Sequence, residues 1–319
     1  MTVRLWDVAG HRALGAPLTG HTAGLWSVAW RAGSATSPVG TAPLATASSD
    51  RTARIWDPVT RRQLGPPLIG HRDGVWSVAW SRDGGTVVTT GGEGDPTLRV
   101  WDARTHRQLG DPLSGHRGGV RAAAWAPDGK TLASASTDDT VRLWDPTTHQ
   151  QVGAALTGHT NWVNDLAWHR DSRTLATAGG DRTVRLWDAT AHRQLGAPLT
   201  GHSSGVRAVA WSSDGKVLAS AGADATIRLW DPTTYQQVGA ALTGHGNWVD
   251  AVAWHPHRNL LASAGGDHTV RLWDVGAHRQ LAVLTGHSSG VRTVAWSPDG
   301  TTLASAGSDH RVRVWSQAW

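Results

Sequence analysis

The 319-residue sequence contains no cysteine and no phenylalanine, and it has only one methionine, one tyrosine, two lysines and one glutamate. The absence of cysteine excludes disulfides and thiolate metal sites. No run of like charge occurs, which excludes a basic tail that follows a phosphate backbone. The sequence shows neither a signal peptide nor an apolar stretch long enough to cross a membrane. We therefore expect a cytoplasmic protein without membrane contact.

The basic charge of the chain has a regular distribution. A formal charge of +5 and an isoelectric point near 10.7 are typical of nucleic-acid-binding proteins. However, one arginine recurs inside a repeated Val-Arg-Leu-Trp pattern, so much of the basic character belongs to a repeated structural unit. These arginines are residues 4, 54, 99, 142, 185, 228, 271 and 313.

The dipeptide Gly-His recurs along the whole chain, which indicates a repeat array. Its histidines are residues 21, 71, 116, 159, 202, 245 and 287, with spacings of 42 to 50 residues. Within the unit 201–231, strand-like runs at 206–211, 216–220 and 226–230 are separated by turn signals, and a fourth run, 236–242, precedes the next Gly-His. We therefore predict four short antiparallel strands per repeat, named a, b, c and d.

These motifs carry a family resemblance. Gly-His, Ser-x-Asp-Gly, Leu-Ala-Ser-Ala-Gly-x-Asp and Ile-Arg-Leu-Trp-Asp in residues 201–231 resemble the tryptophan-aspartate (WD) repeat family of β-propellers. Independently, a four-stranded sheet cannot bury both of its faces alone and must stack on neighbours arranged radially. We therefore expect an all-β protein, with residues 1–319 forming one seven-bladed propeller of four-stranded antiparallel blades.

The amino-terminal residues raise the question of how the ring closes. Residues 2–7 have the pattern of a strand c without a preceding a or b, and residues 12–18 supply a strand d. We expect this strand d to join the last blade and close the ring. Residues 311–315 are favoured over 2–6 as strand c of that blade, because Asp309 then lies beside His287. Residues 2–7 would be a surplus edge strand able to pair with another chain, and a start within a blade fits a piece of a longer protein.

Aspartate, histidine and serine or threonine occur in every repeat, which is the inventory of a serine hydrolase. The resemblance implies a structural role instead, in which the Asp bonds the His, the His bonds the hydroxyl and the hydroxyl bonds a Trp indole. Such a chain of buried groups is favourable when every member is satisfied. In the second repeat, Glu93 competes with Asp95 for this role. The implied sets are His21-Thr46-Asp50-Trp56, His71-Thr89-Asp95-Trp101, His116-Ser134-Asp138-Trp144, His159-Thr177-Asp181-Trp187, His202-Ser220-Asp224-Trp230, His245-Ser263-Asp267-Trp273 and His287-Ser305-Asp309-Trp315.

The remaining histidines do not predict a metal site. The pair His255 and His257 has no third ligand in view, and no glycine-rich loop that cradles a phosphate is present. We therefore expect no metal, no cofactor and no catalytic residue. The histidines expected in c–d loops are spread over different blades, at 11, 106, 149, 192 and 278.

The positions just after Gly-His predict the ligand site, because the resemblance places the start of strand a at the rim of a central channel. Tryptophan and arginine are over-represented at binding hot spots, and a structural role does not require them at a solvent-facing rim. We expect a ligand above the channel between Trp162, Trp248 and Arg207, on the face of the d–a and b–c loops. The predicted ligand-binding residues are Trp26, Trp76, Arg121, Trp162, Asn164, Arg207, Trp248, Asp250 and Arg292.

The sequence thus favours a non-catalytic platform that binds a protein or peptide. By resemblance, bacterial arrays of this kind are sensor or interaction domains of larger signalling proteins. Two alternatives stay open: nucleic acid binding through Arg121, Arg207 and Arg292, and an enzyme that uses the central channel.

Overall fold

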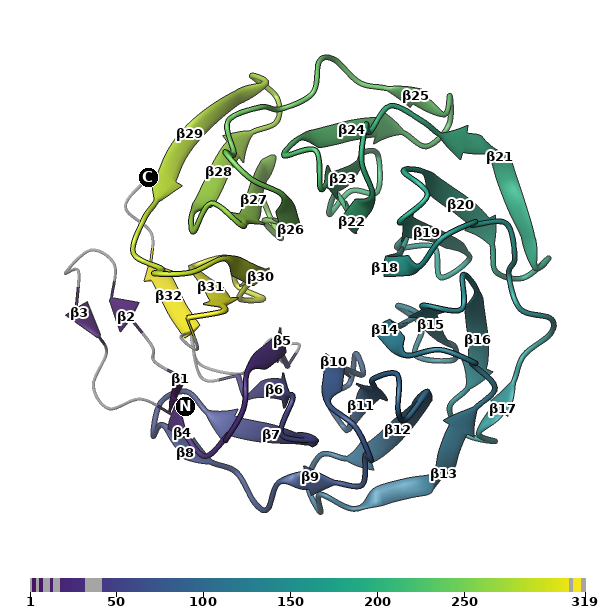
Figure 1. Ribbon diagram of the computed structural model, residues 1–319, viewed down its shortest axis with the longest axis vertical. Helices are drawn as coiled ribbons and strands as arrows, with labels where there is room; N and C mark the ends of the chain where they lie inside the picture. The colour runs from purple at the N-terminus through teal and green to yellow at the C-terminus, as the bar shows by residue number, and fades with distance from the viewer. Residues whose placement is uncertain are drawn as a thin grey trace.

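The computed structural model describes residues 2–3, 6–7, 12–13, 18–31, 42–309 and 312–316. These residues form β-strands joined by turns, and the strands of each sheet run antiparallel. Figure 1 shows the sheets of three or more strands arranged radially, with the first strand of each of them innermost. The predicted all-β propeller is confirmed. In the part of the chain described, no helix is long and apolar enough to cross a membrane.

Six sheets contain four strands or more, and we number the sheets as blades one to seven. Blade one consists of β5 (Leu25–Trp30), β6 (Leu44–Ser48), β7 (Thr52–Asp57) and an outermost strand in two pieces, β8 (Arg62–Gln63) and β9 (Leu68–Ile69). Blade two consists of β10 (Val75–Trp80), β11 (Thr86–Gly91), β12 (Thr97–Asp102) and β13 (Gln108–Ser114), and blade three of β14 (Val120–Trp125), β15 (Leu132–Ser136), β16 (Val141–Asp145) and β17 (Gln150–Gln151).

The later blades repeat this order. Blade four consists of β18 (Val163–Trp168), β19 (Thr174–Gly179), β20 (Val184–Asp188) and β21 (Arg193–Leu199), and blade five of β22 (Val206–Trp211), β23 (Leu218–Gly222), β24 (Ile227–Asp231) and β25 (Gln236–Gln237). Blade six consists of β26 (Val249–Trp254), β27 (Leu260–Gly265), β28 (Val270–Asp274) and β29 (Arg279–Leu284), and blade seven of β30 (Val291–Trp296), β31 (Thr302–Gly307) and β32 (Val312–Ser316).

The second strand of each blade explains why the sheets must stack. In blade five, all of Leu218–Gly222 is buried, and the same holds for the equivalent residues of the other blades. A strand buried on both faces needs a neighbour on each side, and small residues let adjacent blades approach closely. Blades are also tied together by indole N–H groups that donate to a backbone carbonyl of the preceding blade. These bonds are Trp80 to Ala29 (3.1 Å), Trp168 to Ala124 (3.0 Å), Trp211 to Ala167 (3.0 Å), Trp254 to Ala210 (2.9 Å) and Trp296 to Ala253 (3.2 Å).

The repeated arginine of the third strand has a structural role, as predicted. In blade five, Arg228 Nη1 donates to Gln237 Oε1 of the outermost strand at 2.5 Å. A Cβ atom at Gly201, whose φ is 155°, would lie 3.0 Å from this guanidinium, so the glycine before the histidine leaves room for it. The same pairing joins Arg54 to Gln63, Arg99 to Gln108, Arg142 to Gln151, Arg185 to Gln194 and Arg271 to Gln280.

The third strand of blade seven is residues 312–316, as predicted, because Trp315 Nε1 donates to Ser305 Oγ at 2.9 Å. The described amino-terminal residues pair with one another: β1 (Thr2–Val3) with β4 (Leu18–Thr19), and β2 (Trp6–Asp7) with β3 (Arg12–Ala13). β2 lies beside β32. Direct pairing of residues 12–18 with blade seven stays a prediction.

Candidate functional site at the central channel

The histidine network is best followed in blade five, where it joins four buried or half-buried side chains. The Trp230 indole donates to Ser220 Oγ at 2.8 Å, and the distance from Ser220 Oγ to His202 Nε2 is also 2.8 Å. Burial lowers the pKa of His202 even though Asp224 attracts a proton to it, so the imidazole is neutral. The Ser220 hydroxyl then donates to Nε2, and His202 Nδ1–H donates to Asp224 at 2.9 Å. Every donor in the chain therefore has an acceptor.

The same network occurs in all seven blades, which confirms the sets implied by the resemblance. The His–Asp distances run from 2.8 to 3.0 Å. In blade two, Asp95 is the partner of His71, whereas Glu93 Oε2 accepts the backbone N–H of Gly119 at 2.9 Å. Seven equivalent copies of the network lie at the same position of seven sheets, and each copy stabilises its own sheet. The role of the network is therefore structural.

Replacing Asp224 with alanine is expected to destabilise the fold without touching the channel. Asp224 accepts from His202, from the Ser203 N–H and from the Thr226 hydroxyl. Leaving these donors unpaired should lower the free energy of unfolding by about 2 to 3 kcal/mol. Chemical denaturation measures the loss, and Asp224→Asn, which keeps one carbonyl acceptor, should lose less. An activity abolished by Asp224→Ala at unchanged stability would contradict the structural role.

The histidines of the c–d loops also tie blades together. His106, His149 and His192 place Nδ1 within hydrogen-bond distance of a backbone carbonyl of the preceding blade, at 2.7, 2.9 and 3.4 Å. His278 makes the equivalent contact through Nε2 with Ala240, at 3.2 Å. His11 lies outside the described residues. Sequence reasoning placed these histidines in separate blades but missed their role as links between blades.

A β-bulge at the start of every innermost strand shapes the channel. In blade four the pairing register shifts between Val163 and Asp165, and the other six blades shift at the same point. A bulge re-aims a side chain because two residues then oppose one on the partner strand. Two successive residues, such as Asn164 and Asp165, consequently line the channel from each blade.

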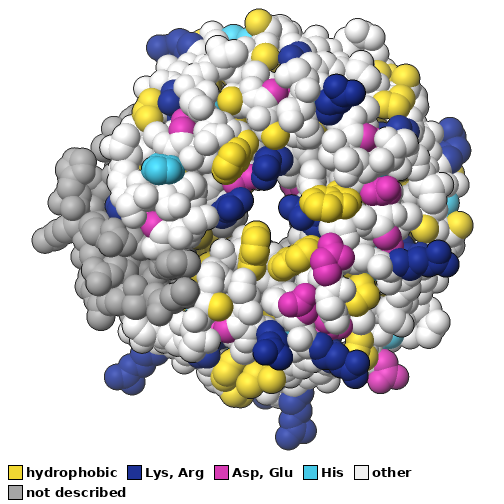
Figure 2. All heavy atoms as spheres, viewed as in Figure 1, with side chains coloured by type: hydrophobic (Ala, Val, Ile, Leu, Met, Phe, Trp, Pro, Cys, Tyr) yellow, Lys and Arg dark blue, Asp and Glu magenta, His cyan; other side chains and the backbone are white. Residues whose placement is uncertain are grey.

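The channel is a cavity of about 300 Å³ to which all seven blades contribute. Figure 2 shows hydrophobic and basic side chains gathered around its opening. The seven predicted rim positions all line it: Trp26, Trp76, Arg121, Asn164, Arg207, Asp250 and Arg292. The other two predicted residues, Trp162 and Trp248, stack on channel arginines, with Arg121 5.7 Å from the centroid of Trp162 and Arg207 5.3 Å from that of Trp248.

Asp250 joins two of the three channel arginines. Its carboxylate lies 2.7 Å from Arg207 Nη1 and 3.3 Å from Arg292 Nη1, and it accepts the Trp248 indole N–H at 3.1 Å. Burial raises the pKa of Asp250, although both arginines act to lower it. The carboxylate thus holds Arg207 and Arg292 in a fixed arrangement.

This arrangement differs from the expected cationic pocket. Arg207 was expected between Trp162 and Trp248, open to a ligand. Instead Arg207 is paired with Asp250 and stacked on Trp248, whereas Trp162 stacks on Arg121. Sequence spacing could not distinguish these pairings, because all of these side chains lie at the same channel opening.

The channel holds one carboxylate that sequence reasoning missed. Asp165 lies on β18 and accepts the Val209 backbone N–H at 3.0 Å. Burial raises its pKa to about 7, against the effect of the Val209 and Leu166 amides. The sequence could have indicated that Asp165 is exceptional, because every other blade has a small residue at the equivalent position. These residues are Ser27, Ser77, Ala122, Ala208, Ala251 and Thr293.

Comparison with known families agrees with this geometry. The family model described as "WD domain, G-beta repeat" matches residues 13–57, 63–102, 107–145, 150–188, 193–231, 236–274 and 278–316. The chain belongs to the WD-repeat family. Each of the last six matched ranges spans the outermost strand of one blade and the three inner strands of the next. All seven matched ranges contain one complete histidine network. No curated protein matches the chain.

Proposed function

We propose that this WD-repeat propeller is a non-catalytic platform that binds a protein or peptide over the channel, on the face of the d–a and b–c loops. WD repeats commonly mediate protein interactions. The observation that carries the proposal is the ring of tryptophan and arginine side chains at the channel opening. Both residue types dominate binding hot spots, since they combine a large contact area with directed hydrogen bonds.

The exposure of two tryptophans supports this face. Trp162 is 51% exposed and Trp26 is 42% exposed, whereas the third-strand tryptophans from Trp56 to Trp315 are at most 3% exposed. The Trp26 and Trp76 rings lie 6.3 Å apart, so they form a continuous aromatic surface across blades one and two. Aromatic surface of this kind, rimmed by polar groups, is typical of an interaction site.

The pairing of charges favours a peptide over a nucleic acid. Asp250 neutralises part of the charge of Arg207 and Arg292. Phosphate backbones are bound by several uncompensated cations, and their release of counterions makes such binding strongly salt-dependent. With two of three channel arginines already paired, the opening is better suited to a ligand that offers apolar surface and a few directed contacts.

Truncating Trp162 or Trp248 is expected to weaken binding of peptides selected from a display library against the wild-type protein. Each alanine variant should lose about 2 kcal/mol or more, which is about thirtyfold in Kd, because a large ring is removed from the contact surface. The melting temperature should change little for the Trp162 variant, because Trp162 is already half exposed to solvent. Calorimetry measures the affinity.

Ile69→Thr is the matched control, because Ile69 is an exposed apolar residue of an outermost strand and four other blades have threonine there. It should bind as the parent does. If both tryptophan variants also bind like the parent, while changes at His106 and His149 weaken binding, the site lies on the opposite face.

We also propose that residues 1–319 form one domain whose ring is completed by residues 12–18. Supporting this, the first matched repeat begins at residue 13 and the last ends at 316, so blade seven needs an outermost strand from the amino-terminal region. Residues 6–7 pair with β3 and lie beside β32, so an edge for a second copy of the chain would be offered by residues 2–3. In the cell, the platform would act in the cytoplasm as the sensor or interaction domain of a larger bacterial signalling protein.

A further inference from the structure

Arg121 stands apart from the other channel arginines. Arg207 and Arg292 share Asp250, and Arg292 also donates to Ser308 Oγ at 3.0 Å. In the part of the chain described, the guanidinium of Arg121 has no hydrogen-bond or ion-pair partner, and its Nε is buried from solvent. Its contacts are with the rings of Trp76 and Trp162, each 5.7 Å from the guanidinium carbon.

Within the described residues, the guanidinium groups of Arg228 and its equivalents in blades one to six donate to a glutamine, whereas the guanidinium of Arg121 has no acceptor. The group carries five N–H donors and no acceptor, and leaving charged donors unpaired away from water is costly. Burial and the charges of Arg207 and Arg292 lower the pKa of Arg121. The charges of Asp250 and Glu93 act to raise this pKa, but neither carboxylate hydrogen-bonds to Arg121. Glu93 is held by the Gly119 N–H and Asp250 by the other two arginines.

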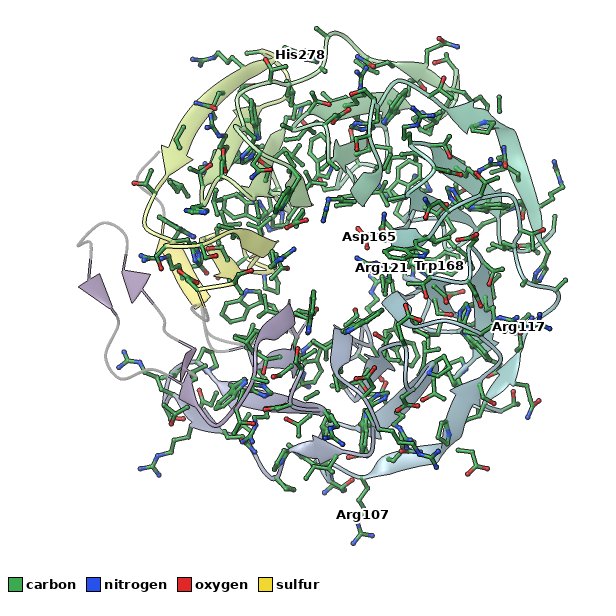
Figure 3. The ribbon with its side chains drawn as sticks, viewed as in Figure 1. Arg107, Arg117, Arg121, Asp165, Trp168 and His278 are labelled. Carbon is green, nitrogen blue, oxygen red and sulfur yellow. The ribbon has the colours of Figure 1, made fainter. Side chains whose placement is uncertain are left out.

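We propose that Arg121 is an oxyanion-binding subsite, which takes a carboxylate or phosphate carried by a peptide side chain. The proposal rests on the proposed function and names the ligand chemistry. Guanidinium groups bind both kinds of oxyanion through two parallel hydrogen bonds. Two indoles that contact the guanidinium hold it in place and leave its N–H groups for the ligand. Figure 3 shows Arg121 at the edge of the channel, where a side chain that enters the opening can reach it.

The surrounding side chains suit an anion at this position. Asp165 lies in the same channel on the adjacent strand β18, and burial holds its pKa near 7, so its charge is reduced at neutral pH. Asp250 faces Arg207 and Arg292. A bound oxyanion would therefore meet the uncompensated cation without a fully charged carboxylate directly opposing it.

The test uses Arg121→Asn, because Asn164 occupies the equivalent position of blade four and the fold therefore tolerates it. Arg117→Asn is the matched control. It removes the same charge from the same blade, but Arg117 lies at the outer edge of the ring (Figure 3). Peptides from the display selection that contain Glu, Asp or phosphoserine are compared with versions in which that residue is Gln. We expect Arg121→Asn to weaken the acidic peptides at least about tenfold more than their Gln versions, and we expect Arg117→Asn to weaken both versions equally or not at all.

A second measurement does not depend on a peptide. Sodium acetate or inorganic phosphate is titrated at constant ionic strength while NMR follows the Arg121 Nε–H signal. A saturable change in the chemical shift of this signal supports the subsite. Comparison of the acetate titration with the phosphate titration shows which of the two oxyanions binds. If selected peptides lose affinity on Trp162→Ala but bind wild type and Arg121→Asn equally, the platform stands and the subsite is wrong. If no peptide binds, the NMR titration alone decides. A saturable change in chemical shift then supports the subsite, and the absence of such a change shows that the subsite proposal is wrong.

Discussion

Replacing Trp230 with alanine should lower the free energy of unfolding by about 3 to 5 kcal/mol. Trp230 is 2% exposed and packs in the cluster between blades four and five that includes Val206 and Leu218. Truncation leaves a cavity too well enclosed to collapse, and it also removes the indole N–H from Ser220. Denaturant titration of the purified variant measures the loss.

Trp230→Phe separates the two contributions to this loss. Phenylalanine keeps most of the ring but removes the N–H donor, so the expected loss is about 1 to 2 kcal/mol. Because Trp230 and Asp224 belong to one network, the double variant Trp230→Ala/Asp224→Ala should lose less than the sum of the single losses. A loss below about 1 kcal/mol for Trp230→Ala would show that this cluster does not hold the two blades together.

Asp165→Asn should stabilise the protein above neutral pH. The folded state raises the pKa of Asp165 from 3.8 to about 7, so folding binds a proton that the unfolded chain releases. The stability that depends on this proton is full below pH 3.8 and is lost as pH rises to about 7. A shift of about three pH units corresponds to roughly 4 kcal/mol. Asparagine cannot ionise but still offers an oxygen to the Val209 N–H. Because Asp165 is only partly buried and lines the channel, the gain at pH 8 should be smaller than that figure.

Unfolding free energies of both proteins at pH 5 and pH 8 test this expectation, with the difference growing toward pH 8. Asp188→Asn in the same blade is the opposite control, because hydrogen bonds from Arg173 and Ala191 lower the pKa of Asp188 to about 2. That variant should be less stable than wild type at neutral pH, and wild type should lose the contribution only as pH falls from 3.8 toward 2. Equal stability of Asp165→Asn and wild type at pH 8 would mean that water reaches the carboxylate.

The fold and the histidine networks could be predicted from the sequence because each depends on contacts within one repeat. His202, Ser220 and Trp230 lie within one unit of about 43 residues. Their spacing recurs seven times, so the structure predicted for one repeat applies to all seven blades. The rim positions followed from the same repeat, since a position that starts the innermost strand in one blade starts it in all.

Tertiary structure decided which rim charges are paired. Asp250 reaches Arg207 and Arg292 across blade boundaries, which leaves Arg121 in contact with two indoles and, among the residues that the structure describes, with no anionic partner. Spacing along the chain places these side chains around one opening, but the pairing depends on side-chain length, rotamer and the bulge that aims each residue. The pKa of Asp165 likewise arises only when seven strands enclose it, because desolvation is a property of the assembled channel rather than of any repeat.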